Sequence, residues 1–362
     1  MTGTKGKSST ASLIALGLER AGHRTGFYSS PHVERVTERA RIGGEEADDD
    51  ELAAAINRSL LAREGDEAVT YFDLLTAAAF DLFTTEAVSW GVIECGLGGR
   101  LDSTNAVMSE VSVITNVDLE HTETLGNTRA AIAREKVGIL KPGTVLVTGI
   151  APGDDEVWPV LKEAARSCDS RIVSVPLVGK SLLQSNLALA QTVLDELGKD
   201  GFETFDGDLL GGSLLDEGLA KEHALPGRME FFSRSGCQIV LDGAHVAPSI
   251  VRVLDETERE PSLEGLPICV FALRSDKDHV ALLKTLQGRV DRVICTSLDS
   301  APFCSASELE AIAKGIGLTA TAVDDPAEAL TRALELASRD GWVLVIGSLY
   351  LAGALRHELG DA

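Results

Sequence analysis

The sequence has 362 residues, of which 44% are hydrophobic, and its formal net charge is −23 at pH 7. This length exceeds what one hydrophobic core usually serves, so we expect two globular domains. The strong negative charge excludes a general nucleic-acid surface, because phosphate backbones are held by clustered lysine and arginine. Any anionic substrate therefore needs a local basic pocket.

The sequence gives no sign of a membrane span or of export. No run of about 18 apolar residues is present, and the first residues lack the charged and then apolar layout of a signal peptide. The cysteines stand apart, without CxxC pairs and mostly in apolar runs, as expected of reduced thiols in a cytoplasmic protein. None is predicted to bind a metal; they are Cys95, Cys168, Cys237, Cys269, Cys295 and Cys304.

The first residues, MTGTKGKSST, have the composition of a phosphate-binding loop before a helix. Small residues let successive backbone N–H groups converge on phosphate oxygens, and the dipole of the helix favours negative charge there. The motif is partial, because Met1 stands where the full pattern has its first glycine, and an ordinary Gly-Lys turn is the alternative. Residues 11–22 favour the phosphate loop, since apolar residues recur at helical spacing and Gly22 can end the helix.

Apolar strands and helices alternate up to about residue 200. Helices are expected over 73–83 and from Asn127, and strands over 24–30, 89–95, 111–116, 144–149 and 171–176. This alternation indicates a doubly wound α/β domain.

A connector is expected where this alternation stops. Residues 200–224 are acidic, contain glycine and are weakly periodic, which is typical of a linking segment. Further strands are expected after it, over 238–245, 268–273, 292–297 and 341–348. The sequence therefore predicts two domains, 1–224 and 225–362, the second an α/β domain without a glycine-rich loop.

Charged residues follow the predicted strands, where open parallel sheets hold their ligands. Glu94 stands near the end of an apolar strand, and a glycine-rich loop with Arg100 and Asp102 follows it. A buried charge is costly unless it meets a cation or a metal. His121 follows the next strand; a lone histidine is more often structural. Beside Glu94 and the phosphate loop, however, it favours Mg²⁺ bound to nucleotide phosphates, although Mg²⁺ prefers oxygen ligands.

Lys136 is predicted to lie on an apolar helix face, because it is spaced three or four residues from Ile132, Ile139 and Leu140. A lysine normally prefers water. One reading is a side chain that extends along the apolar surface to reach solvent. The other reading is a buried amine with a functional role.

The sequence resembles folylpolyglutamate synthase and dihydrofolate synthase of the Mur ligase superfamily. Nine segments carry the resemblance in order: TGTKGKSST, GFYSSPHVERVTERARIGG, YFDLLTAAAF, ECGLGGRLDSTNAV, ITNVDLEHTETLGNTRAAIAREKVGILKPG, PGRMEF, LDGAH, SDKD and GSLYLAGALR. The resemblance implies a P-loop ATPase domain of the Mur ligase type and a smaller Rossmann-like C-terminal α/β domain. It also implies a monomer that uses ATP and Mg²⁺ to join L-glutamate to folate or dihydropteroate, through an acyl phosphate.

The resemblance also implies roles for individual residues. Lys7 would neutralise the γ-phosphate, and Lys136 matches a family lysine that is carbamylated by CO₂ and binds a second Mg²⁺. In the second domain, Arg228 and His245 would act on ATP and the acyl phosphate. The implied metal ligands are Ser30, Glu94, His121 and carbamylated Lys136. The implied ATP contacts are Gly3, Thr4, Lys5, Gly6, Lys7, Ser8, Ser9, Asn186, Arg228 and Asp242. The implied substrate contacts are Arg100, Asp102, Asp276 and Lys277, of which the last two have a structural role as the alternative.

Three residues depart from the family pattern: Ser8 replaces a usual glycine, Glu120 a usual aspartate, and Val246 the asparagine of the bacterial motif. Relatives also have a strand before the phosphate loop, where this sequence has at most Met1 and Thr2. We therefore expect an empty central sheet position, a mobile loop and a chain truncated relative to its natural start. Two other functions stay open: a Mur-type ligase acting on a different carboxylate, and a nucleotide-binding homologue without ligase activity.

Overall fold

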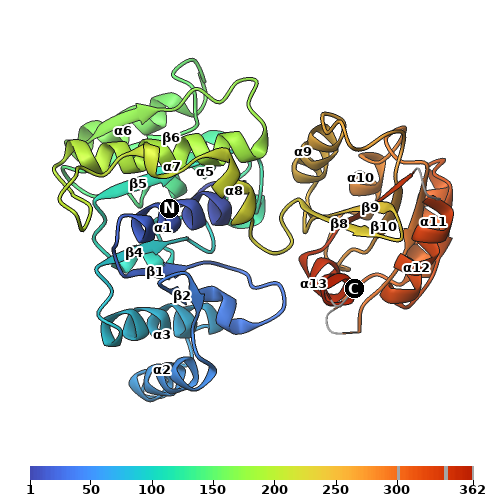
Figure 1. The fold of residues 1–362 in the computed structure, drawn as a ribbon, viewed down its shortest axis with the longest axis horizontal. Coiled ribbons are helices and arrows are strands. Elements are labelled where there is room, and N and C mark those ends of the chain that lie inside the picture. Colours follow the sequence, from blue (N-terminus) through green and yellow to red (C-terminus); the bar gives the residue numbers. More distant parts are fainter. Residues whose placement is uncertain (300–301, 338–340, 361–362) are drawn as a thin grey trace. The chain divides into compact units, whose positions relative to one another are not determined.

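The computed structural model describes residues 1–299, 302–337 and 341–360, and the chain divides into two compact units, Met1–His223 and Ala224–Ala362 (Figure 1). Both units are layered α/β structures, as the alternation of strands and helices predicts. The boundary between them falls one residue before the expected one.

The strands of the N-terminal unit form two sheets. One has the order β3-β2-β1-β4 and the other the order β5-β6-β7. The bounds are β1 (Thr25–Tyr28), β2 (Ala40–Ile42), β3 (Glu45–Glu46), β4 (Trp90–Ile93), β5 (Val111–Ile114), β6 (Val145–Thr148) and β7 (Arg171–Ser174). β1 pairs in parallel with β4, and β5, β6 and β7 pair in parallel with one another. The antiparallel hairpin of β2 and β3 was not predicted.

Met1 and Thr2 connect these two sheets. The carbonyl of Met1 accepts a hydrogen bond from the N–H of Cys95 at 2.9 Å, just beyond β4. On the other side, Thr2 pairs in parallel with Ile114 of β5, and its N–H donates to the carbonyl of Val113 at 2.8 Å. The central position that we expected to be empty is therefore filled at these two residues, and they anchor the start of the phosphate loop.

Helix α1 (Lys7–Arg20) begins directly after the phosphate loop and packs against α7 (Leu182–Lys199), beside which it lies in Figure 1. The two helices approach closely at Gly17, where a Cβ would lie 2.5 Å from Cδ1 of Leu194. The remaining helices up to α6 are α2 (Asp49–Ala62), α3 (Tyr71–Thr85), α4 (Thr122–Leu125), α5 (Arg129–Val137) and α6 (Trp158–Ser167), with the 3₁₀ helices η1 (Val36–Arg39) and η2 (Ser103–Ala106).

The segment 200–224 is more than a connector. It contains the 3₁₀ helix η3 (Gly212–Leu214) and the helix α8 (Glu217–Glu222), and both contact α7. The side chain of Asp216 caps α8 by accepting a hydrogen bond from the N–H of Leu219 at 2.9 Å. Elements this short span too few turns to produce a hydrophobic period, which is why the sequence pattern missed them.

The C-terminal unit contains one sheet with the strand order β12-β11-β10-β13-β9-β8, and β8 is its antiparallel strand. Buried apolar clusters lie on both faces of this sheet. The strands are β8 (Glu230–Arg234), β9 (Cys237–Leu241), β10 (Ile268–Phe271), β11 (Arg292–Cys295), β12 (Ala320–Ala322) and β13 (Trp342–Ile346). The helices are α9 (Ala247–Thr257), α10 (His279–Lys284), α11 (Ala306–Gly315), α12 (Pro326–Ala337) and α13 (Leu349–Gly360). The second α/β domain predicted from the sequence is confirmed, with β8 and β12 as additions.

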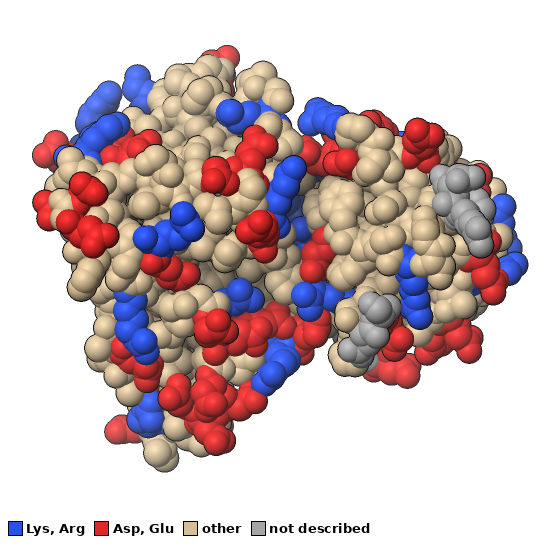
Figure 2. Space-filling model, in the orientation of Figure 1, with Lys and Arg blue, Asp and Glu red and all other residues tan. Residues whose placement is uncertain are grey.

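The excess of acidic residues is spread over the surface. Aspartate and glutamate side chains lie across the face of each unit shown in Figure 2, with lysine and arginine between them. Within the described ranges, no helix is both long enough and apolar enough to span a membrane.

Candidate active site

The phosphate loop is held by asparagine side chains that come from distant parts of the chain. Oδ1 of Asn116, after β5, accepts hydrogen bonds from the N–H groups of Thr4 at 3.1 Å and Lys5 at 2.9 Å. Gly6 ends the loop in a left-handed conformation, with φ of 77°, and caps α1. A Cβ at Gly6 would lie 2.3 Å from Oδ1 of Asn186, which belongs to α7. The loop is therefore fixed from two sides, and glycine is required at position 6.

Lys7 and Asn186 make further hydrogen bonds at the loop and at the helix that follows it. The amine of Lys7 donates a hydrogen bond to the carbonyl of Gly3 at 2.9 Å and so folds back over the loop. Oδ1 of Asn186 accepts a hydrogen bond from the hydroxyl of Thr10 in α1 at 3.3 Å. The arrangement matches what a phosphate loop requires, a rigid turn of small residues at the beginning of a helix with a lysine beside it.

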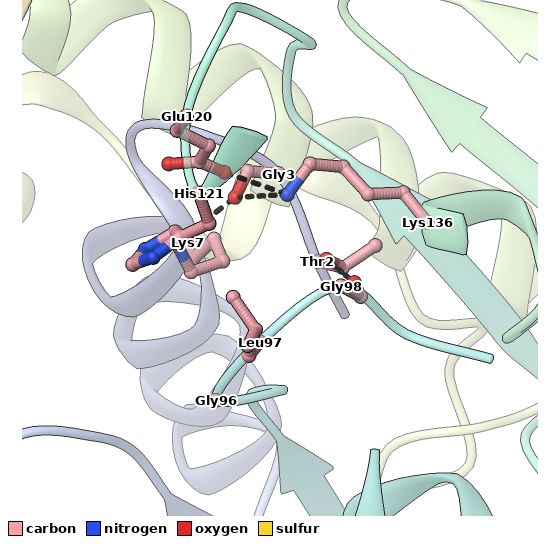
Figure 3. Close-up of a pocket in the computed structure, with 9 residues that line it drawn as sticks. All are labelled: Thr2, Gly3, Lys7, Gly96, Leu97, Gly98, Glu120, His121 and Lys136. Carbon is pink, nitrogen blue, oxygen red and sulfur yellow. Dashed lines mark hydrogen bonds and ion pairs between the residues drawn. The ribbon is translucent and has the colours of Figure 1, made fainter. Parts of the chain in front are cut away.

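A small pocket opens beside the loop (Figure 3). The loop, the glycine-rich segment after β4, the segment after β5 and helix α5 all contribute to it. Its lining residues are Thr2, Gly3, Lys7, Gly96, Leu97, Gly98, Glu120, His121 and Lys136. Elements far apart in the sequence thus meet at the carboxyl ends of the strands, where parallel sheets hold their ligands.

Lys136 points into this pocket and forms an ion pair with Glu120 (Figure 3). Its Nζ lies 2.8 Å from Oε1 of Glu120 and 3.1 Å from the carbonyl oxygen of Gly3. The Lys136 side chain is only 2% exposed, so the inward orientation predicted from the helical spacing is confirmed. Burial lowers the pKa of the Lys136 amine, and the Glu120 carboxylate opposes this shift.

Glu120 stays ionised next to that amine. Burial alone would raise the pKa of its carboxyl, but the cations of Lys136 and Lys7 outweigh burial and lower the pKa overall. The glutamate that stands where the resemblance implies an aspartate is thus in direct contact with Lys136.

Glu94 forms a second cluster at the ends of β4 and β1. Its side chain is buried, and Oε1 accepts a hydrogen bond from the hydroxyl of Ser8 at 3.0 Å. Oε2 lies 3.3 Å from the backbone N–H of Ser30, which follows β1. Because β1 and β4 are parallel neighbours, their carboxyl ends bring Ser30 and Glu94 together.

The chemistry of this cluster fits a hard divalent cation such as Mg²⁺. The buried carboxylate of Glu94 and the hydroxyl of Ser8 beside it are oxygen groups, the kind of ligand that Mg²⁺ prefers. Among the described residues, no group of three or more His, Cys, Asp or Glu side chains is placed to hold a metal ion. His121 lies in the pocket with Lys7 and Lys136.

In the C-terminal unit, Asp242 links the two segments that carry Arg228 and His245. Its carboxylate accepts hydrogen bonds from the N–H groups of Met229 at 2.9 Å and Ala244 at 2.7 Å. Nδ1 of His245 lies 2.9 Å from the carbonyl oxygen of Gly243. A carbonyl oxygen only accepts, so this contact places the imidazole proton on Nδ1.

Models of two protein families match the chain. The Mur ligase middle domain matches residues 1–205, and the Mur ligase glutamate ligase domain matches residues 227–349. The chain belongs to the Mur ligase family. The resemblance predicted from the nine sequence segments is confirmed.

Individual relatives of this Mur ligase are folate enzymes. The chain is 32% identical to the folylpolyglutamate synthase of Lacticaseibacillus casei, over 99% of this chain and 89% of the relative. Escherichia coli FolC, solved in complex with DHPP and ADP, has a TM-score of 0.84 at 27% identity and covers 99% of this chain and 87% of its own. The bifunctional folylpolyglutamate synthase/dihydrofolate synthase of Yersinia pestis, complexed with AMPPNP and Mn ion, also has a TM-score of 0.84, at 28% identity, with coverage of 99% and 88%.

The substrate-contact residues expected in the N-terminal unit of this Mur ligase have structural partners. Arg100 forms an ion pair with Glu135 of α5 at 3.0 Å. The carboxylate of Asp102 accepts hydrogen bonds from the N–H groups of Leu97 at 2.8 Å and Thr104 at 3.0 Å, and so caps η2. Both side chains therefore fix the glycine-rich segment that lines the pocket.

Asp276 and Lys277, expected to contact substrate in the C-terminal unit, lie together after β10. Asp276 accepts a hydrogen bond from Nε of Arg274 at 3.1 Å and lies 3.5 Å from the amine of Lys277. Sequence reasoning missed Asn116 as a residue that holds the phosphate loop. Its position at the end of the apolar strand β5 was the available signal.

Proposed function

We propose that this chain is an ATP-dependent ligase that joins L-glutamate to the carboxylate of a pterin-containing acid such as dihydropteroate or tetrahydrofolate. The observation that carries the proposal is the phosphate loop, clamped by Asn116 and Asn186 beside the buried pocket of Lys7, Glu120 and Lys136. The family models and the folate enzymes among the relatives support the substrate class.

The first step activates the carboxylate of the pterin-containing acid, which is a poor electrophile. A carboxylate oxygen of the acid attacks the γ-phosphorus of ATP, the bond to the β-γ bridging oxygen breaks, and ADP leaves. The loop N–H groups and the amine of Lys7 hold the phosphate oxygens and offset the negative charge that gathers in the transition state. The resemblance to the folate ligases also implies a role in this step for Arg228 and His245.

The second step forms the amide. The amine of glutamate attacks the acyl carbon, the bond to the phosphate oxygen breaks, and inorganic phosphate leaves while the nitrogen loses a proton. Phosphate is a good leaving group, whereas the oxide of a free carboxylate is not. Mg²⁺ held by Ser30, Glu94 and His121, the ligands that the resemblance implies, would supply charge neutralisation to the nucleotide phosphates.

Lys136 in its carbamylated form would provide a further anionic ligand. A carbamate on Nζ would place negative charge close to Glu120, from which the amine is 2.8 Å away. Two such anions in a buried pocket require a cation between them, because an unpaired buried charge is costly. The Lys136–Glu120 geometry therefore supports a second Mg²⁺ in the pocket and a role for Glu120 beside it.

ADP release tests the proposed function. Release is measured with ATP and Mg²⁺ alone, with the pterin acid alone, with glutamate alone and with both, using dihydropteroate and tetrahydrofolate separately. We expect sustained release only when both substrates are present. Lys7→Met should abolish it, whereas Lys162→Met, at an exposed position of α6, should not.

Three results would contradict the proposal. Release supported only by a cell-wall precursor carboxylate would indicate a ligase for another substrate. Nucleotide binding without any release would indicate a homologue without ligase activity. ADP release that does not depend on glutamate would exclude amide formation with that amino acid.

A further inference from the structure

Arg228 lies in a backbone turn that has to be held in place. Both of its neighbours adopt left-handed conformations, Gly227 with φ of 65° and Met229 with φ of 50°. Glycine tolerates this region, but a residue with a Cβ such as Met229 does so only when the surrounding structure enforces it. The orientation of Arg228 therefore depends on the groups that bind the turn.

One of these groups is Glu230, the first residue of β8. Its Oε2 accepts a hydrogen bond from the N–H of Gly227 at 2.7 Å. Its carboxylate in turn is held by Arg356 of α13, whose Nε lies 2.9 Å from Oε1 and 3.2 Å from Oε2. The Glu230 side chain is 14% exposed, so the hydrogen bond to Gly227 lies largely out of water.

The other side of the turn is held by Asp242, whose carboxylate accepts a hydrogen bond from the N–H of Met229 at 2.9 Å. The carbonyl of Gly227 also accepts a hydrogen bond from the N–H of Gly243 at 2.9 Å. The residues on both sides of Arg228 thus each donate an N–H to a carboxylate. Hydrogen bonds with a charged partner are the stronger kind, so two of them can keep a strained turn in one conformation.

We propose that Glu230, fixed by Arg356, is a positioning residue that sets the direction of Arg228 for phosphoryl transfer. This inference rests on the proposed function, in which Arg228 has a role in phosphoryl transfer. An arginine side chain has many rotamers, and its backbone turn decides the region they sample. Releasing Gly227 from Glu230 lets the turn relax, and Arg228 then spends less time in the productive orientation.

Single-turnover ADP formation tests this role in a double-mutant cycle. Glu230→Ala should slow the step by about tenfold or more, within the range for misplaced catalytic groups, while the Kd for ATP stays unchanged. In the Arg228→Ala background, Glu230→Ala should add no further loss, because residues acting as one unit are not additive. An equal loss in both backgrounds, or no loss in either, would overturn the proposal.

Conservative variants separate positioning from folding. Glu230→Gln keeps an acceptor for the N–H of Gly227 and should retain more activity than Glu230→Ala. Arg356→Lys keeps a cation beside Glu230 and should retain more activity than Arg356→Met. If the Glu230→Ala variant unfolds, the comparison of Arg356→Lys with Arg356→Met decides, and equal losses in these two variants would contradict the role. Glu335→Ala is the matched control, since it removes an exposed ion pair with Arg332 on α12 of the same unit.

Amide hydrogen exchange tests the turn independently of ligase activity. In Glu230→Ala the N–H groups of Gly227 and Met229 should exchange faster, whereas those of β10 should not change. Unchanged protection would refute the inference even if the enzyme is active. If exchange is faster but the protein releases no ADP with any acceptor, the role of Glu230 in holding the turn is supported. The proposed function is then overturned instead.

Discussion

The amine of Lys136 in α5 and the carboxylate of Glu120 after β5 lie 2.8 Å apart, and the same amine donates to the carbonyl of Gly3 in the phosphate loop. Both side chains are almost entirely buried. A buried ion pair contributes little to stability by itself, but losing one partner leaves an uncompensated charge. We therefore expect the pair to have a role in chemistry beside the loop rather than in stability.

Lys136→Ala should abolish turnover, because it removes both the amine that would carry a carbamate and the contact to Gly3. Added bicarbonate should not restore activity, whereas acetate, as a short carboxylate, should restore part of it. ADP release provides the measurement. Full activity of Lys136→Ala would exclude this residue from the site.

The same variant should lose stability through Glu120. Removing one partner of a buried ion pair costs about 3–5 kcal/mol, since the other charge is left in a medium of low dielectric. Lys136→Ala combined with Glu120→Gln should recover much of this loss in thermal unfolding without recovering ADP release. Recovery of activity in the double variant would show that the lysine serves only to neutralise Glu120.

Arg228→Ala should slow acyl-phosphate formation by about 10²-fold or more, which is the range for a lost electrostatic donor. Nucleotide affinity should fall less, because the loop and Lys7 provide the main phosphate contacts. Single-turnover ADP formation and ATP binding, measured separately, check both statements. Unchanged single-turnover formation would remove Arg228 from the candidate site.

Gly6→Ala should weaken ATP binding by about tenfold or more, because a strained backbone costs about 1–3 kcal/mol and each 1.4 kcal/mol is tenfold. Its Cβ would also lie 2.3 Å from Oδ1 of Asn186 and displace this side chain from the loop. Gly43→Ala is the control, since Gly43 also has a positive φ but nothing within 4 Å of a new Cβ. Calorimetric titration with ATP should separate the two, and equal affinities would contradict the clamp at Gly6.

Glu19 makes stability depend on pH. Burial raises the pKa of this carboxyl from 4.5 to about 7, against the opposing effect of Arg41. The folded state thus keeps a proton that the unfolded state loses, so stability falls as pH rises from about 4.5 to about 7. Glu19→Gln should melt at a higher temperature than the natural protein at pH 8 and at a similar one at pH 4.5. Glu67→Gln, at an exposed position, should show no such difference.

The sequence by itself determined the features that depend on near neighbours in the chain. The phosphate loop of Gly3 to Gly6 before α1, the alternation of strands and helices, and the inward position of Lys136 follow from spacings of two to four residues. Such spacings decide which face of an element is buried, because strands and helices repeat at fixed periods. The short helices η3 and α8 and the hairpin of β2 and β3 escaped this reasoning, since they span too few residues to show a period.

Only the tertiary structure decided which distant residues meet. Asn186 against Gly6, Ser8 against Glu94, and Glu120 against Lys136 are contacts made by the order of the strands and the packing of α1, α5 and α7. The pairing of Met1 and Thr2 between β4 and β5 is likewise a result of strand order. Periodicity fixes the face that each element buries but not the neighbour it buries against, so these partners emerged only when the whole chain packed.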